Sequence, residues 1–232
     1  MNEAEALALA GLGWRIIPIP LGEKRPTLTR WVEQATDEES VIMGWWMMDE
    51  LNAGLVLGPQ PSGQNLIALD IDDREGYSGS EQLATLEEQF EPLPETVVSI
   101  TGSGGRHILL ALPEGMHSPT TVGLCDGPGI DTRGAGGQIV LPPSIHPNGR
   151  AYEWEEDHSP WDLEVAAAPE WVLVLLAPKI QGPQPIQLRT GAPRPTALGA
   201  RELAGHSLNR RLSWDELMSM IGGRFLGQRR VR

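Results

Sequence analysis

An acidic pair closes an apolar, strand-like run in the first half of the chain. Asp70 and Asp72 end the run 66–72. Because side chains alternate along a strand, both carboxylates lie on one face, about 6.5–7 Å apart. Carboxylates this close repel each other unless a cation lies between them. A third carboxylate, Asp131, follows in a similar setting. Hard oxygen ligands suit Mg²⁺ or Mn²⁺, and a pair of such ions commonly serves phosphoryl transfer. The pattern therefore indicates a metal-dependent nucleotidyl transferase.

A glycine-rich turn before a histidine is the second feature that could do chemistry. Ser103, Gly104 and Gly105 precede His107, which opens another apolar run. Backbone N–H groups in such a turn, with a hydroxyl and an imidazole beside them, can cradle a triphosphate. A histidine at the start of a strand can equally be a structural residue. The turn therefore predicts nucleotide binding, with a packing role for His107 as the alternative.

Further polar residues are candidates for substrate contacts. Arg133 follows Asp131 by two positions and could either pair with that carboxylate or bind a phosphate. Ser144 and His146 stand in a proline-rich loop and could contact phosphate or sugar, although prolines and an Asn-Gly step alone would produce such a loop. Lys24, in a polar turn, is either an exposed lysine or a phosphate or template contact.

A mixed set of helices and strands must position these residues. Helix signals cover 2–11, 36–51, 80–90 and 169–177, and Thr36 with Glu39 predicts a capping box for the second of them. Apolar runs predict strands over 14–20, 53–57, 66–72, 96–101, 107–112 and 151–154. Glycine-rich turns predict two hairpins, one joining 96–101 to 107–112 and the other joining 129–131 to 138–141.

Composition divides the chain into three parts. We expect a catalytic domain over 1–178, a linker rich in proline, glycine and glutamine over 179–197, and a basic helical tail over 198–232. The chain carries a net charge of −13, yet residues 185–232 hold nine arginines against three acids. The tail could reach a polynucleotide or remain a solvated segment, so charge alone decides neither for nor against nucleic acid.

Cysteine usage and hydropathy exclude several other classes of protein. The single cysteine, Cys125, rules out an intramolecular disulfide and a multi-cysteine zinc site. The longest apolar stretch, 171–177, is far too short to span a bilayer, and no secretory signal precedes the first helix. We therefore expect a cytoplasmic protein with no membrane partner and no zinc.

In their order and separation, these segments resemble the motifs of the bifunctional primase–polymerase domain in the archaeo-eukaryotic primase superfamily. The matching features are Asp70-x-Asp72, Ser103-Gly-Gly-x-His107, Asp131-x-Arg-Gly-x-Gly-Gly, Pro142-Pro-Ser-x-His-x-x-Gly, Tyr152-x-Trp154 and the early Gly-x-Lys-x-Pro around Lys24. The resemblance spans roughly residues 5–178, and its specificity comes from the ordered set. Gln138 departs from the family, which often has an aromatic residue after the glycine pair.

The resemblance implies a two-part α+β fold, in which an RRM-like antiparallel sheet packs against an N-terminal αβ unit. It also implies that Asp70, Asp72 and Asp131 bind two divalent ions, while His107 contacts the triphosphate. Family members make RNA or DNA primers on single-stranded DNA from nucleoside triphosphates in plasmid, phage or mobile-element replication. Larger family members carry a helicase with a Walker A loop, which this sequence lacks. We therefore expect a stand-alone form, a fragment of a larger protein, or a subunit that recruits a separate helicase.

We therefore expect a DNA-dependent primase or polymerase that works by two-metal nucleotidyl transfer. The first alternative is a DNA-binding replication initiator of the same fold with weak catalysis. The second is a nucleotide-sugar glycosyltransferase using Asp70 and Asp72, which would leave the glycine turn and the Asp131 segment without a role.

Overall fold

The structure is a computed structural model that describes residues 1–118, 120–124 and 128–177. The linker expected over 179–197, the basic helical tail over 198–232 and Cys125 lie outside the described residues. The proposed domain boundaries accordingly stay a prediction.

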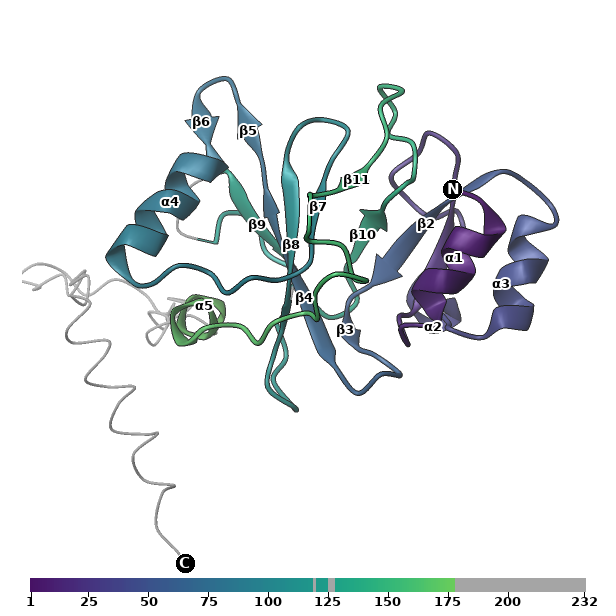
Figure 1. Cartoon of the computed structure of the whole chain (residues 1–232), viewed down its shortest axis with the longest axis horizontal. Helices are drawn as coiled ribbons and strands as arrows, with labels where there is room; N and C mark the ends of the chain where they lie inside the picture. Colours follow the sequence, from purple (N-terminus) through teal and green to yellow (C-terminus); the bar gives the residue numbers. More distant parts are fainter. Residues whose placement is uncertain (119, 125–127, 178–232) are drawn as a thin grey trace, which may run out of the picture. The chain divides into compact units, whose positions relative to one another are not determined.

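Two antiparallel sheets form the framework of the described residues (Figure 1). The six-stranded sheet has the order β11 (Glu153–Trp154), β7 (Val98–Ile100), β8 (Arg106–Ala111), β4 (Asn65–Ile71) and β3 (Gly58–Pro59), and β9 (Ile130–Arg133) also pairs with β4. The three-stranded sheet consists of β1 (Ile16–Pro20), β2 (Leu51–Val56) and β10 (Gln138–Leu141). A short hairpin joins β5 (Asp73–Arg74) to β6 (Tyr77–Ser78).

Helices accompany each sheet. They are α1 (Glu3–Ala10), α2 (Trp31–Gln34), α3 (Glu39–Trp46), α4 (Gly79–Gln89) and α5 (Glu170–Leu176). Figure 1 shows α1 to α3 near β2, and α4 and α5 beside the larger sheet. The mixture of helices with antiparallel sheets confirms the expected α+β class.

Strand β4 is buried on both faces, as its apolar run predicts. Leu66 and Ala68 belong to a core shared with α1, β1, β2 and β10. Ile67, Leu69 and Ile71 point the other way, into a core with residues of α4 and α5. Asp70 continues the Leu66–Ala68 side, so its carboxylate emerges on the face that the larger sheet turns toward the shared core.

The second hairpin expected from the sequence is wrong. Strand β9 pairs with β4 of the larger sheet, whereas β10 pairs with β2 of the smaller one. The glycine-rich segment between them passes from one sheet to the other, and the Leu57 N–H donates to the Gly137 carbonyl at 2.9 Å. Main-chain pairing with β2 therefore outcompetes a local hairpin, and a strand from late in the chain completes the N-terminal αβ unit.

The capping box expected at Thr36 is also wrong. Helix α3 begins at Glu39 after the N-cap Glu38 and ends at Trp46, well before residue 51. The Thr36 hydroxyl accepts from the Glu38 N–H at 3.0 Å, while the Thr36 main chain bridges to Ile16. Pairing with β1 holds Thr36 in an extended conformation, so the helix starts later.

Asp73 should stabilise α4 in a pH-dependent way. Its carboxylate accepts from the Ser80 N–H at 3.0 Å and from the Ser78 and Ser80 hydroxyls at 2.7 Å. These bonds, that of the Ser80 N–H above all, lower the pKa of Asp73 to about 2. Asp73→Ala should lower the free energy of unfolding by about 1 kcal/mol at neutral pH, the usual cost of losing a helix cap.

The sign of the pH effect follows from the depressed pKa. The stabilisation by Asp73 is present above its unfolded pKa near 4 and is lost as the pH falls toward about 2. Urea unfolding at several pH values checks this, with Glu75→Ala in the same turn as the control. A destabilisation by Asp73→Ala that stays constant from neutral pH to pH 2.5 would contradict the assignment.

Candidate active site

Four polar residues form a row across the larger sheet. Asp131 of β9 lies opposite Asp70 of β4, which lies opposite His107 of β8, which lies opposite Ser99 of β7. Directly opposed residues in antiparallel strands share a face. His107 Nε2 lies 3.7 Å from Asp70 Oδ1, and its Nδ1 lies 3.4 Å from Ser99 Oγ. The sheet register thus brings together two of the three predicted acids and the predicted histidine.

Arg133 occupies the space between the two opposed acids. Its Nε and Nη2 donate to Asp70 Oδ2 at 3.1 and 2.6 Å, and Nη2 also lies 3.5 Å from Asp131 Oδ2. The sequence left open whether Arg133 pairs with Asp131 or binds a phosphate; in the structure its closest partner is Asp70. The guanidinium neutralises a pair of like charges that would otherwise destabilise neighbouring strands.

Asp72 lies just beyond β4, beside the glycine turn. Its N–H donates to the Gly129 carbonyl at 2.8 Å, and its Oδ2 accepts from Arg74 at 2.7 Å. A Cβ atom added to Gly105 would lie 3.0 Å from Asp72 Oδ1 and 2.5 Å from the Ile71 carbonyl. The turn and the end of β4 therefore approach each other so closely that only glycine fits.

Gly105→Ala should consequently damage the site. The added methyl group would push against the β4 backbone, and we expect a loss of about 3 kcal/mol in unfolding free energy, at the upper end of overpacking effects. Gly104→Ala is the matched control, because its Cβ meets no described atom within 4 Å and the cost is the strain of a φ of +94°. Urea unfolding of both variants checks this; equal losses would show that the close approach to β4 does not matter.

The glycine turn uses its own N–H groups. Gly104 donates to the Thr101 carbonyl at 2.8 Å, and Gly105 donates to the Thr101 hydroxyl at 3.0 Å. The Ser103 and Thr101 hydroxyl groups lie 2.9 Å apart. Two of the N–H groups expected to cradle a triphosphate thus stabilise the turn instead, while Ser103 is exposed. Phosphate binding by Ser103, Gly104 and Gly105 stays a prediction.

A buried tyrosine contacts both histidines, stacked on His107 and tilted against His146. The Tyr152 ring lies 6.2 Å from that of His107 and 5.7 Å from that of His146. Burial, together with the negative charges of Asp70 and Asp72, raises the pKa of Tyr152 to about 12. Tyr152 therefore keeps its hydroxyl proton and fixes both imidazoles against one ring.

His146 has a ring nitrogen without a hydrogen-bond partner among the described residues. Its Nδ1 accepts from the Asn148 N–H at 3.1 Å, which places the proton of the neutral ring on Nε2. That Nε2 is buried and has no hydrogen-bond partner among the described residues. Buried donors are normally satisfied, so a ligand acceptor would complete this one.

Ser144 and Lys24 lie in different surroundings. Ser144 is buried, and its hydroxyl accepts from the Ala53 N–H at 3.0 Å, anchoring the proline-rich loop on β2. Lys24 is exposed, and its carbonyl accepts from the Gln138 amide at 2.7 Å. Nucleotide contacts by Ser144 and Lys24 stay predictions.

Burial lowers the pKa of His107 below its usual range. The negative charge of Asp70 opposes this shift, while the positive charges of Arg133 and Lys24 add to it.

The donor set suits a hard divalent ion. Asp70, Asp72 and Asp131 offer only carboxylate oxygens, the ligands that Mg²⁺ and Mn²⁺ prefer. As the side chains are arranged, the described ranges contain no group of three or more His, Cys, Asp or Glu residues placed to hold a metal. Arg133 places a guanidinium between Asp70 and Asp131, so a positive charge of the protein itself neutralises these two carboxylates.

A family model identifies the family to which the chain belongs. Residues 6–171 match the model described as bifunctional DNA primase/polymerase, N-terminal. The chain belongs to this family. Every residue of the polar row lies within the match, and the resemblance seen in the sequence motifs is confirmed. No curated protein matches the chain.

Membership in the primase/polymerase family gives the chain a role in replication. It indicates nucleotidyl transfer as the chemistry, with DNA and nucleotides as substrates. Within the described ranges, no helix has the length and apolar character needed to cross a membrane. The cytoplasmic location and a separate helicase partner stay predictions.

Proposed function

We propose that this chain is a DNA-dependent primase/polymerase that synthesises primers on single-stranded DNA by two-metal-ion nucleotidyl transfer, in plasmid, phage or mobile-element replication. The observation that carries this proposal is the register that sets Asp131, Asp70 and His107 side by side, with Asp72 two residues beyond Asp70. This arrangement lies within the part of the chain that matches the family model.

Three carboxylates would hold the ions. Asp70, Asp72 and Asp131 would bind two Mg²⁺ or Mn²⁺ ions, which when bound lower the pKa of the attacking 3′-hydroxyl and stabilise charge on the pyrophosphate leaving group. In the structure Arg133 places its positive charge between Asp70 and Asp131, so an ion bound by both carboxylates would displace this guanidinium.

The remaining residues would bind and orient the nucleotide. Arg133, once released from Asp70, can form charge-assisted hydrogen bonds with a phosphate. His107, neutral because burial lowers its pKa, would contact the triphosphate without adding charge. His146 would donate its unpartnered Nε2–H to the bound nucleotide. Ser103, Gly104, Gly105, Ser144 and Lys24 complete the proposed nucleotide-binding set.

The alternative function is a DNA-binding replication initiator with weak catalysis. One observation favours it: Arg133 pairs with Asp70 and thereby blocks part of the proposed ion site. The glycosyltransferase alternative gains nothing from the family match.

Nucleotide incorporation on unprimed and primed single-stranded DNA, with Mg²⁺ or Mn²⁺, separates these functions. Products on the unprimed template would support a primase, and the nucleotide required would identify the sugar preference. Extension of the primed template alone would support a polymerase that awaits a partner. DNA binding without any product would overturn the enzymatic proposal in favour of the initiator.

A further inference from the structure

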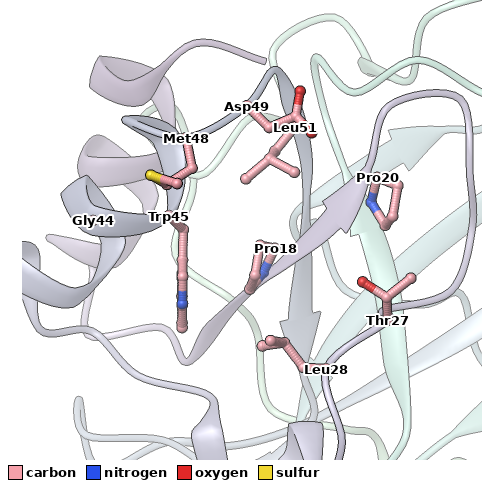
Figure 2. Close-up of a pocket in the computed structure, with 9 residues that line it drawn as sticks. All are labelled: Pro18, Pro20, Thr27, Leu28, Gly44, Trp45, Met48, Asp49 and Leu51. Atoms are coloured by element: carbon pink, nitrogen blue, oxygen red, sulfur yellow. The ribbon is translucent and has the colours of Figure 1, made fainter.

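An apolar hollow lies away from the polar row, between α3, β1 and the loop that follows β1. Its volume is about 220 Å³, and its walls include Pro18, Leu28, Trp45, Met48 and Leu51. Figure 2 shows these side chains grouped around the hollow, with Trp45 descending from α3 toward the loop. Its size suits one large apolar side chain, and the proposed chemistry of the polar row does not use it.

Helix α3 is apolar well beyond its core-facing side. Ile42 is fully buried, whereas Met43 and Met47 are 41% and 78% exposed and Met48, next to the hollow, is 85% exposed. A surface helix normally turns its apolar stripe inward and polar residues outward. A contiguous apolar patch on a soluble surface marks an interaction site, and methionine adapts well to varied partners.

Gly44 is the position in the wall from which the hollow can be filled by substitution. It lies in the middle of α3 and forms part of the wall. A Cβ atom added there would meet no described atom within 4 Å, so no packing within the described residues requires glycine. Glycine in a helix interior is destabilising relative to alanine. A side chain larger than alanine at position 44 therefore has room to extend over the hollow.

The charge around the hollow selects the kind of occupant. Residues 31–50 contain six acids and no lysine or arginine. Glu38 is the N-cap of α3 and Glu39 its first residue, Asp49 and Glu50 follow the helix, and all four are exposed. This surface repels phosphate groups and attracts lysine and arginine. The segment between β1 and α2 adds the basic residues Lys24, Arg25 and Arg30, of which Arg30 pairs with Glu33 at 3.5 Å. Residues 21–50 still hold seven acids against these three basic residues, which makes nucleic acid the weaker candidate.

We propose that the α3 hollow is a docking site for a basic segment of a partner protein, which inserts one large apolar side chain between Trp45 and Leu28. An apolar anchor in a pocket surrounded by charged residues is the usual arrangement of an interface hot spot. The acidic residues flanking α3 would steer the basic segment and set its orientation. The proposal goes beyond the proposed enzymatic function and does not depend on it.

NMR of isotope-labelled methionine methyl groups in the full chain tests this proposal. The probes are short lysine-flanked peptides with a central leucine, phenylalanine or tryptophan, and matched peptides with glutamate in place of lysine. At least one lysine-flanked peptide should shift the Met48 signal saturably and bind about tenfold more tightly than its glutamate counterpart. Gly44→Phe should fill the hollow and weaken binding about tenfold or more, whereas Gly44→Ala should bind like the wild type.

Three results would overturn the proposal. They are no binding by any lysine-flanked peptide, a Met48 shift caused by oligothymidylate instead of peptide, and a Met48 signal that depends on protein concentration in a self-associating chain. Nucleotide incorporation by Gly44→Phe should match the wild type, which separates this site from the polar row, and its thermal unfolding should show a folded chain at least as stable as the wild type. If Gly44→Phe does not fold, Leu28→Gln provides the second variant, because it changes the apolar wall and keeps the Met48 signal. Unchanged peptide binding by Leu28→Gln would count against the hollow.

Discussion

Replacing Asp70 and Asp72 together by asparagine should reduce nucleotide incorporation on single-stranded DNA by at least about 100-fold. Asparagine keeps the volume and an oxygen acceptor for Arg133, but it removes the negative charge that would hold a divalent ion. Losing several kcal/mol of charge stabilisation in the transition state corresponds to a factor of this size. The measurement is primer synthesis per enzyme at saturating nucleotide and template.

The matched control is Glu75→Gln, an exposed carboxylate three residues beyond Asp72. It should retain wild-type synthesis, because it lies outside the polar row. Thermal unfolding of the double variant without metal should remain close to that of the wild type. Full primer synthesis by Asp70→Asn/Asp72→Asn would remove these residues from the chemistry.

Arg133→Gln should destabilise the metal-free protein and make it more responsive to Mn²⁺. Asp70 has a side chain only 11% exposed, and it would lose its ion-pair partner. Breaking a fully buried pair costs about 3–5 kcal/mol; since Arg133 is 31% exposed, we expect about 2 kcal/mol. With the guanidinium gone, Mn²⁺ competes with no internal cation, so it should raise the melting temperature more in the variant than in the wild type.

Arg74→Gln is the control for Arg133. Arg74 pairs with Asp72 at 2.7 Å but is 65% exposed, and a surface pair of this kind contributes little to stability. Thermal unfolding with and without Mn²⁺ compares the two variants. If Arg133→Gln were as stable as the wild type and no more responsive to Mn²⁺, Arg133 would not compete with an ion for Asp70 and Asp131.

The sequence predicts local features of this fold well. The apolar run before Asp70 predicts a strand buried on both faces. The glycine turn over residues 102–105 predicts the hairpin that joins β7 to β8. Both depend on side-chain period and turn chemistry within a few residues. Helix α1 likewise follows from nearby residues, because Asn2 and Glu5 form a reciprocal cap.

Pairing between distant strands is what the sequence alone does not reveal. That Asp131 faces Asp70 depends on the register of β9 against β4, and no local pattern encodes it. The same limit explains why the segment 134–137 is mistaken for a hairpin turn when it crosses between sheets.

Ser99 and Tyr152 join the site for the same reason. Ser99 is an ordinary strand residue until the β7–β8 register places it opposite His107. Tyr152 belongs to one of the sequence motifs that resemble the family, but its contact with both His107 and His146 follows only from the folded chain. The sequence leaves the partner of Arg133 open. The pairing of β9 with β4 places Arg133 beside Asp70 and so determines this ion pair.

The most direct test of the account is a Mn²⁺ titration of the full chain, with free Mn²⁺ followed by electron paramagnetic resonance, in the presence of a non-hydrolysable nucleoside triphosphate. We predict saturable Mn²⁺ binding to the wild type and to Glu75→Gln, and a loss of affinity of at least about tenfold in Asp70→Asn/Asp72→Asn. Mn²⁺ affinity unchanged by that double substitution would contradict a metal site built on Asp70 and Asp72, whatever activity the chain shows.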